Sequence, residues 1–258
     1  MPAGVRALSS FRGGGASSVP YASLNLGGHV GDAAAAVAEN RRRLVIEAGL
    51  PSEPVWLAQV HGVTVADLDA VGPVHTLETL GVSGGAAASA GAGALPPADA
   101  AFTRQPGRVC AILTADCLPI VLAADSGDLV AAAHAGWRGL ASGVIEATVR
   151  ALGVEPGRLM AWLGPAIGPG HFEVGAEVRE ALLQGDSGAE DAFLPNSRGR
   201  FMADLAALAR RRLASVGVDR IYGGGHCTFA EGERYFSHRR DGVTGRQATL
   251  TWLQPSRG

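Results

Sequence analysis

Three side chains that can bind a metal stand at the ends of apolar runs. His61, Cys117 and His134 each follow a short, mostly apolar run that is typical of a buried strand. Imidazole and thiolate are both ligands of zinc, and a set of three leaves the fourth position open for water or substrate. Residues of these types are more often simply packed, and the chain has no compact Cys-x-x-Cys or His-Glu-x-x-His motif. The trio is therefore a candidate open zinc site, provided that the fold brings three distant segments together.

Asp116 directly precedes the candidate thiolate ligand. A carboxylate at this place can act as a general acid or base, or it can orient a ligating imidazole. The alternative is a residue at the end of a strand that caps local amides. Of the acids in the chain, Asp116 is the best acid–base candidate, so Asp116 and Cys117 are the predicted catalytic residues.

The composition restricts the partners that the chain can have. Its formal net charge of −2 gives no electrostatic reason to expect a nucleic acid or a membrane surface as partner. The chain contains no lysine, so a phosphate must be bound by arginine, by backbone N–H groups or by a metal. Three cysteines are too few for a disulfide scaffold. With neither a secretory signal nor a membrane-spanning run in this sequence, we expect a cytoplasmic protein that acts on a small molecule; the sequence is silent on its oligomeric state.

Helical and strand patterns alternate along the chain. Apolar periodicity predicts a helix that Asp32 caps, and further helices follow at 140–152, 176–183 and from Asp204 onward. Short β-type runs outnumber them and are often adjacent, which favours antiparallel or mixed pairing over a doubly wound parallel sheet. These runs lie at 55–60, 109–113, 120–123, 129–133, 159–163 and 247–252, with a weaker one at 220–222.

The chain of 258 residues fits a single α+β domain with mixed β-sheets flanked by helices. One stretch differs from the rest, because residues 81–97 are nearly all Gly, Ala and Ser and end in two prolines. Such a sequence buries little apolar surface. Since strand and helix patterns resume on both sides, we interpret it as a flexible surface loop inserted in the domain 1–258.

Ordered motifs along nearly the whole chain resemble the YfiH or laccase-domain family, which is also described as purine nucleoside phosphorylase-like and as a peptidoglycan editing factor. The matching segments include Arg12-Gly13-Gly14-Gly15, Ser23-Leu24-Asn25-Leu26-Gly27, Gln59-Val60-His61-Gly62, Thr114-Ala115-Asp116-Cys117-Leu118-Pro119, His134-Ala135-Gly136-Trp137-Arg138-Gly139 and Thr244-Gly245-Arg246-Gln247. The resemblance implies a YfiH-like sandwich fold, and it implies that His61, Cys117 and His134 bind zinc.

The resemblance also implies an activity on purine nucleosides with phosphate, and a possible adenosine deaminase activity at the same metal. It makes Arg12 a candidate for a contact with substrate or phosphate, and the alternative for Arg12 is a solvated loop at the N-terminus. Asn25 and Gln59 are further substrate-binding candidates, because an amide can bind a purine edge or a ribose hydroxyl. Either amide can equally satisfy the local backbone, and this alternative is slightly favoured for Gln59.

Two other activities follow from the names of the same family. The first is a laccase-type polyphenol oxidase, since copper also accepts two histidines and a cysteine. The chain has seven histidines and no His-x-His pair, which argues against a multicopper centre, so copper is the less favoured metal. The second is a peptidoglycan-precursor hydrolase that removes a wrongly added amino acid from a nucleotide-linked muramoyl sugar, and the sequence does not separate it from nucleoside chemistry.

Overall fold

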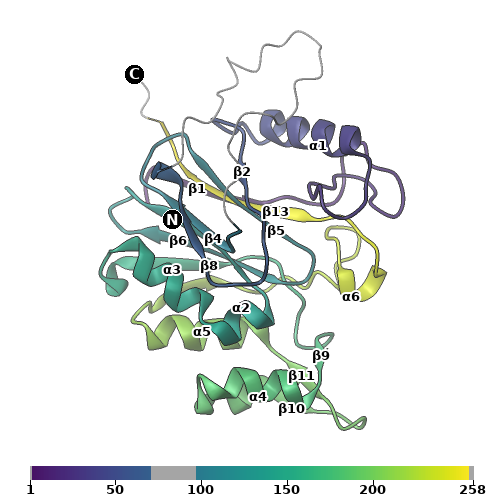
Figure 1. The fold of residues 1–258 in the computed structure, drawn as a ribbon, viewed down its shortest axis with the longest axis vertical. Coiled ribbons are helices and arrows are strands. Elements are labelled where there is room, and N and C mark those ends of the chain that lie inside the picture. Colours follow the sequence, from purple (N-terminus) through teal and green to yellow (C-terminus); the bar gives the residue numbers. More distant parts are fainter. Residues whose placement is uncertain (1, 71–96, 256–258) are drawn as a thin grey trace.

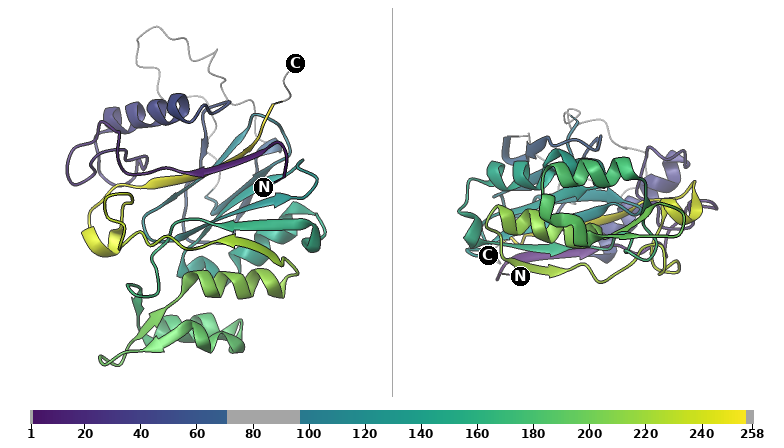
Figure 2. Two further views of the ribbon diagram at one scale, coloured as in Figure 1. Left: turned by 180° about the vertical axis from the view of Figure 1, so that it is seen from behind. Right: turned by 90° about the horizontal axis from the view of Figure 1, so that it is seen from below.

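In the computed structural model, which describes residues 2–70 and 97–255, two mixed β-sheets lie between helices (Figures 1 and 2). The larger sheet has six strands in the order β12-β8-β6-β7-β4-β3. Its members are β3 (Val65–Asp67), β4 (Ala100–Thr103), β6 (Leu118–Ala124), β7 (Val130–Ala135), β8 (Leu159–Leu163) and β12 (Arg220–Gly223).

The second sheet has four strands in the order β1-β13-β5-β2. They are β1 (Val5–Ser9), β2 (Val55–Trp56), β5 (Val109–Thr114) and β13 (Gln247–Leu253). Its pairs are antiparallel except for β2, which runs parallel to β5. In the six-stranded sheet only the outer pairs β12–β8 and β3–β4 are parallel. Both sheets are therefore mixed, and the predicted α+β class is confirmed.

The two sheets pack face to face through small and branched side chains. Ile112 and Cys110 of β5 meet Ala101 of β4 and Ala132 of β7 in one buried cluster. These strands can approach closely because the facing residues are mainly Ala, Ile and Cys rather than aromatic residues. A sandwich built in this way brings the ends of strands from both sheets to a common edge.

Helices cover the outer faces of the sandwich, as Figure 1 shows. On the four-stranded sheet, α1 (Ala34–Glu47) buries Leu44 and Val45 against β5 and β13. On the six-stranded sheet lie α2 (Trp137–Ser142), α3 (Val144–Leu152) and α5 (Leu205–Ser215).

The remaining elements lie at one end of the molecule or form short turns. The small sheet of β9 (Glu173–Val174), β10 (Phe193–Pro195) and β11 (Phe201–Ala203) lies beside α4 (Ala176–Gln184), at the lower end in Figure 1. The short helices are η1 (Leu68–Ala70), η2 (Pro156–Arg158), η3 (Ser187–Ala192) and α6 (His238–Asp241). In the part of the chain that the structure describes, no helix is both long and apolar enough to cross a membrane.

Several boundaries differ from those that the sequence predicts. The helix predicted at 140–152 is two helices, because Gly143 adopts a φ of 90° and ends α2 before α3 begins. Ala33, not Asp32, is the N-cap of α1, and the Asp32 carboxylate instead accepts hydrogen bonds from Ser17, Asn25 and the Ala33 N–H. The run 55–60 contributes only a two-residue strand. The predicted loop at 81–97 lies outside the described residues, apart from Pro97.

The predicted start of α5 is confirmed, since the Asp204 side chain accepts a hydrogen bond from the Ala207 N–H at 2.9 Å. Asp204→Ala removes this cap and is expected to lower the free energy of unfolding by about 1 kcal/mol. Urea denaturation measures the change. Asp191→Ala is the matched control, because Asp191 is exposed in η3 and caps no helix among the described residues. Equal stability of the two variants would contradict the prediction.

Candidate metal centre

His61, Cys117 and His134 meet at the edge where the two sheets converge. Their ligand atoms all lie within 4.8 Å of one another, and the Cys117 Sγ is 3.9 Å from the His61 Nε2. Tetrahedral zinc bonds to sulfur and nitrogen would place such atoms roughly 3.5 Å apart. The donor types and spacing therefore fit a metal ion with small adjustments, and the fold brings the three segments together, while metal binding by the trio stays a prediction.

The sheets themselves determine where each member of the trio lies. Cys117 stands in the crossing from β5 of one sheet to β6 of the other. Pro119 of β6 pairs with His134 of β7, so Cys117 lies close to that histidine. His134 is inside its strand and not beyond its end as predicted, because β7 continues to Ala135. His61 follows β2 in a tight bend with a φ of 61°, which an L-residue seldom adopts.

A buried carboxylate that the sequence analysis missed holds two of these segments together. Asp99, which is fully buried, accepts hydrogen bonds from the backbone N–H groups of Val60, His61 and Gly62 at 3.2, 2.9 and 2.6 Å. The same carboxylate lies 2.8 Å from the Nδ1 of His134. This contact leaves the His134 Nε2 as its ligand atom, and the backbone bonds fix the bend that carries His61. Asp99 is thus a positioning residue.

The charges within the site favour the ionised forms. Burial alone raises the pKa of Asp99, but hydrogen bonds from His134 and from the Gly62 and Val60 N–H groups outweigh burial and lower it. Burial also raises the pKa of the Cys117 thiol, yet the neighbouring His134 and His61 bring it below its usual value. A thiolate is the form in which cysteine ligates a metal, so the trio is electrostatically prepared for a cation.

One side of the trio is open to solvent. His134 is 3% exposed and Cys117 is half-buried, whereas His61 is exposed. These three groups could hold a metal, and a small molecule could approach the site from the exposed side of His61. This arrangement is typical of a catalytic site rather than of a closed structural one.

Gly136 forms the wall beside the sulfur. A Cβ at this position would lie 2.8 Å from the Cys117 Sγ and 3.3 Å from the His61 Cδ2. We expect Gly136→Ala to displace the ligands, because overpacking of this kind costs about 1–3 kcal/mol. When this free-energy cost falls on metal binding, the metal affinity decreases by about 5- to 150-fold. Competition with a chelator measures the change.

Gly157→Ala is the control for this prediction, since a Cβ there meets nothing within 4 Å among the described residues. It is expected to keep the metal affinity of the unchanged protein. A Gly136→Ala variant that binds metal as tightly as this control would show that the glycine does not shape the site.

Asp116 lies beside the trio with both carboxylate oxygens engaged. Its Oδ1 accepts a hydrogen bond from the Thr228 hydroxyl at 2.7 Å, and its Oδ2 accepts one from the Arg239 N–H at 2.6 Å. The backbone of Asp116 has a φ of 93°, which turns the chain into Cys117. These bonds fix the orientation of the carboxylate next to the candidate ligand, and its acid–base role stays a prediction.

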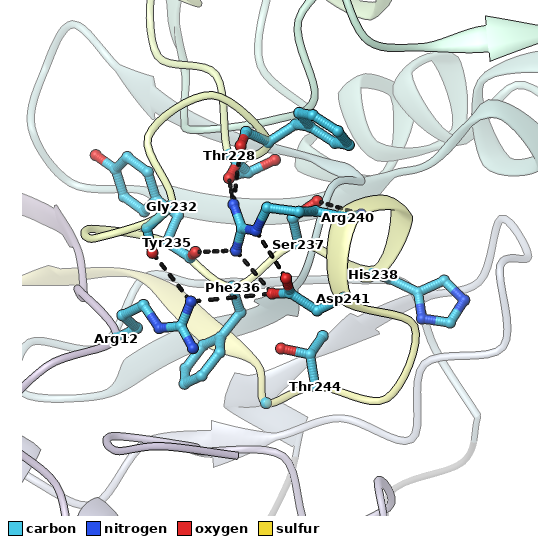
Figure 3. Close-up of polar contacts among 12 residues, drawn as sticks. Arg12, Thr228, Gly232, Tyr235, Phe236, Ser237, His238, Arg240, Asp241 and Thr244 are labelled. Atoms are coloured by element: carbon cyan, nitrogen blue, oxygen red, sulfur yellow. Dashed lines mark hydrogen bonds and ion pairs between the residues drawn. The ribbon is translucent and has the colours of Figure 1, made fainter. Parts of the chain in front are cut away.

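The Arg12 guanidinium is engaged within the chain (Figure 3). Its Nε and Nη2 donate to the Ala22 carbonyl at 3.2 and 3.1 Å, and its Nη1 donates to the Gly232 carbonyl at 3.0 Å. The Asp241 carboxylate lies 3.9 Å away, and the guanidinium stacks over the ring of Phe236. Arg12 thus joins the N-terminal segment to the loop before β13, and its predicted contact with substrate stays a prediction.

The two candidate amides also bind the backbone. Asn25 is fully buried, and its four hydrogen-bonding positions serve the Gly27 N–H and carbonyl, the Asp32 carboxylate and the Arg246 N–H. Gln59 pairs with both the N–H and the carbonyl of Leu113 at 2.8 and 2.9 Å. The structure supports the structural alternative for both amides, most completely for Asn25, and their substrate roles stay predictions.

The comparison with known proteins covers nearly the whole chain. Residues 6–254 match the family model described as multi-copper polyphenol oxidoreductase laccase. The chain is 49% identical to the purine nucleoside phosphorylase YfiH of Shigella flexneri, over 98% of this chain and 96% of that protein. It is 50% identical to a purine nucleoside phosphorylase of Pseudomonas aeruginosa, over 98% and 95%.

Solved structures agree with this match. A Neisseria meningitidis protein has a TM-score of 0.86 and 44% identity, over 98% of this chain and 96% of that chain. YlmD from Geobacillus stearothermophilus has a TM-score of 0.85 and 34% identity, over 98% and 93%. With the sandwich, the trio and these relatives in agreement, the chain belongs to the YfiH or laccase-domain family, whose model bears the multi-copper polyphenol oxidoreductase laccase name.

Proposed function

We propose that the chain is a zinc-dependent purine nucleoside phosphorylase, with adenosine deamination as a second reaction at the same site. The observation that carries the proposal is the match of 49–50% identity, over almost the full length of both proteins, to relatives named purine nucleoside phosphorylase. The open trio of His61, Cys117 and His134 supports it, because a three-ligand set leaves room for substrate. Substrates of this class are adenosine, inosine, guanosine and methylthioadenosine.

The chemistry of phosphorolysis is a displacement at the anomeric carbon of the ribose. A bond forms between a phosphate oxygen and C1′, the C1′–N9 bond breaks, and its electron pair leaves with the purine, which takes up a proton. When bound, zinc supplies a positive centre that can position an anion or activate a water. The protein must also orient both substrates and provide an acid–base group beside them.

Among the described residues, several side chains are placed to meet these requirements. Asp99 fixes the bend of His61 and the ring of His134, so two imidazoles are oriented before any ligand binds. Asp116 is the proposed acid–base group, held beside Cys117 by Thr228 and by the backbone of Arg239. The exposed side of His61 is the proposed entrance for the nucleoside.

The test combines metal analysis of the purified protein with an assay of adenosine, inosine and guanosine in the presence and absence of inorganic phosphate. We expect about one zinc ion per chain and release of free purine that depends on phosphate. Deamination of adenosine would yield inosine without phosphate. Absence of purine release from every nucleoside, with metal bound, would refute the proposal.

A polyphenol oxidase is the second candidate, favoured by the printed name of the family model. It requires copper and oxidation of a phenol by dioxygen, and the same preparation tests it. Copper in stoichiometric amount together with phenol oxidation would reverse the order of the two candidates. Zinc alone, with phosphate-dependent purine release, would exclude it.

A further inference from the structure

Two arginines flank the turn that contains Gly27 and Gly28, near the candidate metal centre. Arg246, just before β13, donates through its Nη1 to the carbonyls of Thr244 and Gly245 at 2.9 and 3.0 Å. Arg41 of α1 donates through its Nε and Nη2 to the Leu26 carbonyl at 3.1 and 2.9 Å. Within residues 2–70 and 97–255, neither arginine forms an ion pair with a carboxylate.

Strand register places Arg246 at the same edge as the trio. The next residue, Gln247, begins β13 and pairs with Thr114, the last residue of β5 and two residues before Asp116. The charges of Cys117 and Asp116 reach the guanidinium, since they raise the pKa of Arg246 against the stronger lowering by burial. Arg246 is therefore a cation beside the candidate thiolate and the candidate acid–base group.

The backbone at Gly27 allows the side chain of Arg246 to pack closely against it. A Cβ at Gly27 would lie 2.8 Å from the Cγ of Arg246, so only a residue without a side chain fits beneath its stem. The buried Asn25 accepts a hydrogen bond from the Arg246 N–H at 2.9 Å, which fixes the start of the side chain. Asn25, predicted as a substrate contact, thus positions the arginine.

Arg41 and His29 complete a basic cluster around the turn. The Nη2 of Arg41 would lie 4.0 Å from a Cβ at Gly28, and its guanidinium stacks over the Trp56 ring. Both arginines act on His29, because its partial burial and the charges of Arg246 and Arg41 lower its pKa. Glu53, which hydrogen-bonds Trp56, acts on Arg41 through longer-range attraction. The turn therefore carries two positive charges, with Glu53 acting on Arg41 and with Cys117 and Asp116 acting on Arg246 from the candidate metal centre.

Arg246 has donors to offer a ligand. Among the described residues its Nε and Nη2 have no hydrogen-bond partner, and neither atom is both buried and unsatisfied, so both reach solvent. A guanidinium with two free N–H positions matches the oxygens of a tetrahedral anion. A half-buried cation without a carboxylate partner is stabilised when such an anion binds beside it. In Arg12, by contrast, Nε, Nη1 and Nη2 all donate to carbonyls of the chain.

We propose that Arg246, supported by Arg41, binds the phosphate co-substrate beside the His–Cys–His trio. This inference rests on the proposed function for the identity of the anion, and it assigns the phosphate contact to Arg246 rather than to Arg12, the arginine for which the family resemblance suggests a contact with substrate or phosphate. The phosphate oxygens accept hydrogen bonds from the Nε and Nη2 of Arg246, and the charge of Arg41 adds to the attraction. The nucleoside then approaches from the exposed side of His61.

The test measures phosphate binding directly and through turnover. Metal-loaded protein is titrated with inorganic phosphate by calorimetry, and purine release from inosine is followed at varied phosphate and varied inosine concentrations. Arg246→Gln is expected to weaken phosphate binding and to raise the KM for phosphate by about 10- to 100-fold, as for the loss of charge-assisted hydrogen bonds. The KM for inosine is expected to change by less than about threefold.

Three further variants complete the design. Arg246→Lys keeps a positive charge and is expected to recover part of the phosphate affinity. Arg41→Gln is expected to weaken phosphate binding less than Arg246→Gln, and it serves if the latter is unstable. Arg42→Gln is the matched control, because Arg42 is exposed on the same helix and pairs with Glu39.

The outcomes separate this inference from the proposed function. Unchanged phosphate affinity in folded, metal-loaded Arg246→Gln and Arg41→Gln would overturn the inference, as would equal rises of both KM values. If the unchanged protein releases purine from no nucleoside, the proposed function fails, and calorimetry still decides the inference. Phosphate binding that depends on Arg246 then supports an anion site, and absence of phosphate binding by the unchanged protein overturns it.

Discussion

Replacing Cys117 by alanine is expected to abolish metal binding and purine release together. The change removes the only sulfur ligand of the trio and leaves two imidazoles, one of them exposed. Loss of a metal that contributes several kcal/mol to the transition state lowers kcat/KM by on the order of 10³-fold or more. Elemental analysis after dialysis gives the metal content, and a phosphate-dependent nucleoside assay gives the activity.

Cys227→Ala is the control for this variant. Cys227 is half-buried, and its sulfur accepts hydrogen bonds from the N–H groups of Gly168 and Ala230 rather than facing the trio. It is expected to retain both metal and activity. Turnover by a metal-free Cys117→Ala protein would separate the reaction from the metal and would refute the proposed mechanism.

Replacing Asp99 by asparagine is expected to damage both the metal centre and the fold. Asparagine keeps the shape but loses the charge that holds three backbone N–H groups and the His134 ring. Loss of one partner from such a buried charged network lowers the free energy of unfolding by about 3–5 kcal/mol. Loss of an orienting group behind a ligating histidine lowers metal affinity by about 10- to 100-fold.

Asp125→Asn is the corresponding surface control. Asp125 is exposed to solvent and forms ion pairs with Arg158 and Arg220, so its loss is expected to leave stability nearly unchanged, because solvent screens such surface pairs. Thermal unfolding with and without added zinc measures both effects. Wild-type metal affinity in Asp99→Asn would mean that the backbone alone fixes the two histidines.

Sequence patterns predicted the class of the fold well where an apolar run is long and bounded by clear signals. The strand predicted at 159–163 coincides with β8, and the helix predicted at 176–183 differs from α4 by one residue. The short strands β3 and β9 were not predicted, because three and two residues are too few to show a periodic pattern. The break at Gly143 was also missed, since an isolated glycine within a helical pattern is tolerated and does not by itself predict the end of the helix.

The sequence identified the candidate metal ligands but not the residue that positions them. His61, Cys117 and His134 carry their chemistry in the side chain, so residue type and family resemblance identify them. Asp99 supports them through backbone N–H groups of a segment 37 to 39 residues away, and the pairing of β4 with β7 brings it to His134. No local pattern encodes such a contact. The only signal was an isolated acid at the start of an apolar run.

The pair of hydrogen bonds between Gln59 and Leu113 has a consequence for the thermodynamics of ion capture. The Gln59 side chain continues the hydrogen bonding between β2 and β5, and it thereby attaches the segment before His61 to β5. Asp99 in turn connects Gly62, after His61, to His134 of β7. Because these segments are already held in place, the binding of a cation orders few further residues and buries little apolar surface. Zinc binding should therefore show a heat-capacity change near zero in calorimetry, unlike the large negative value of a site that folds around its ion.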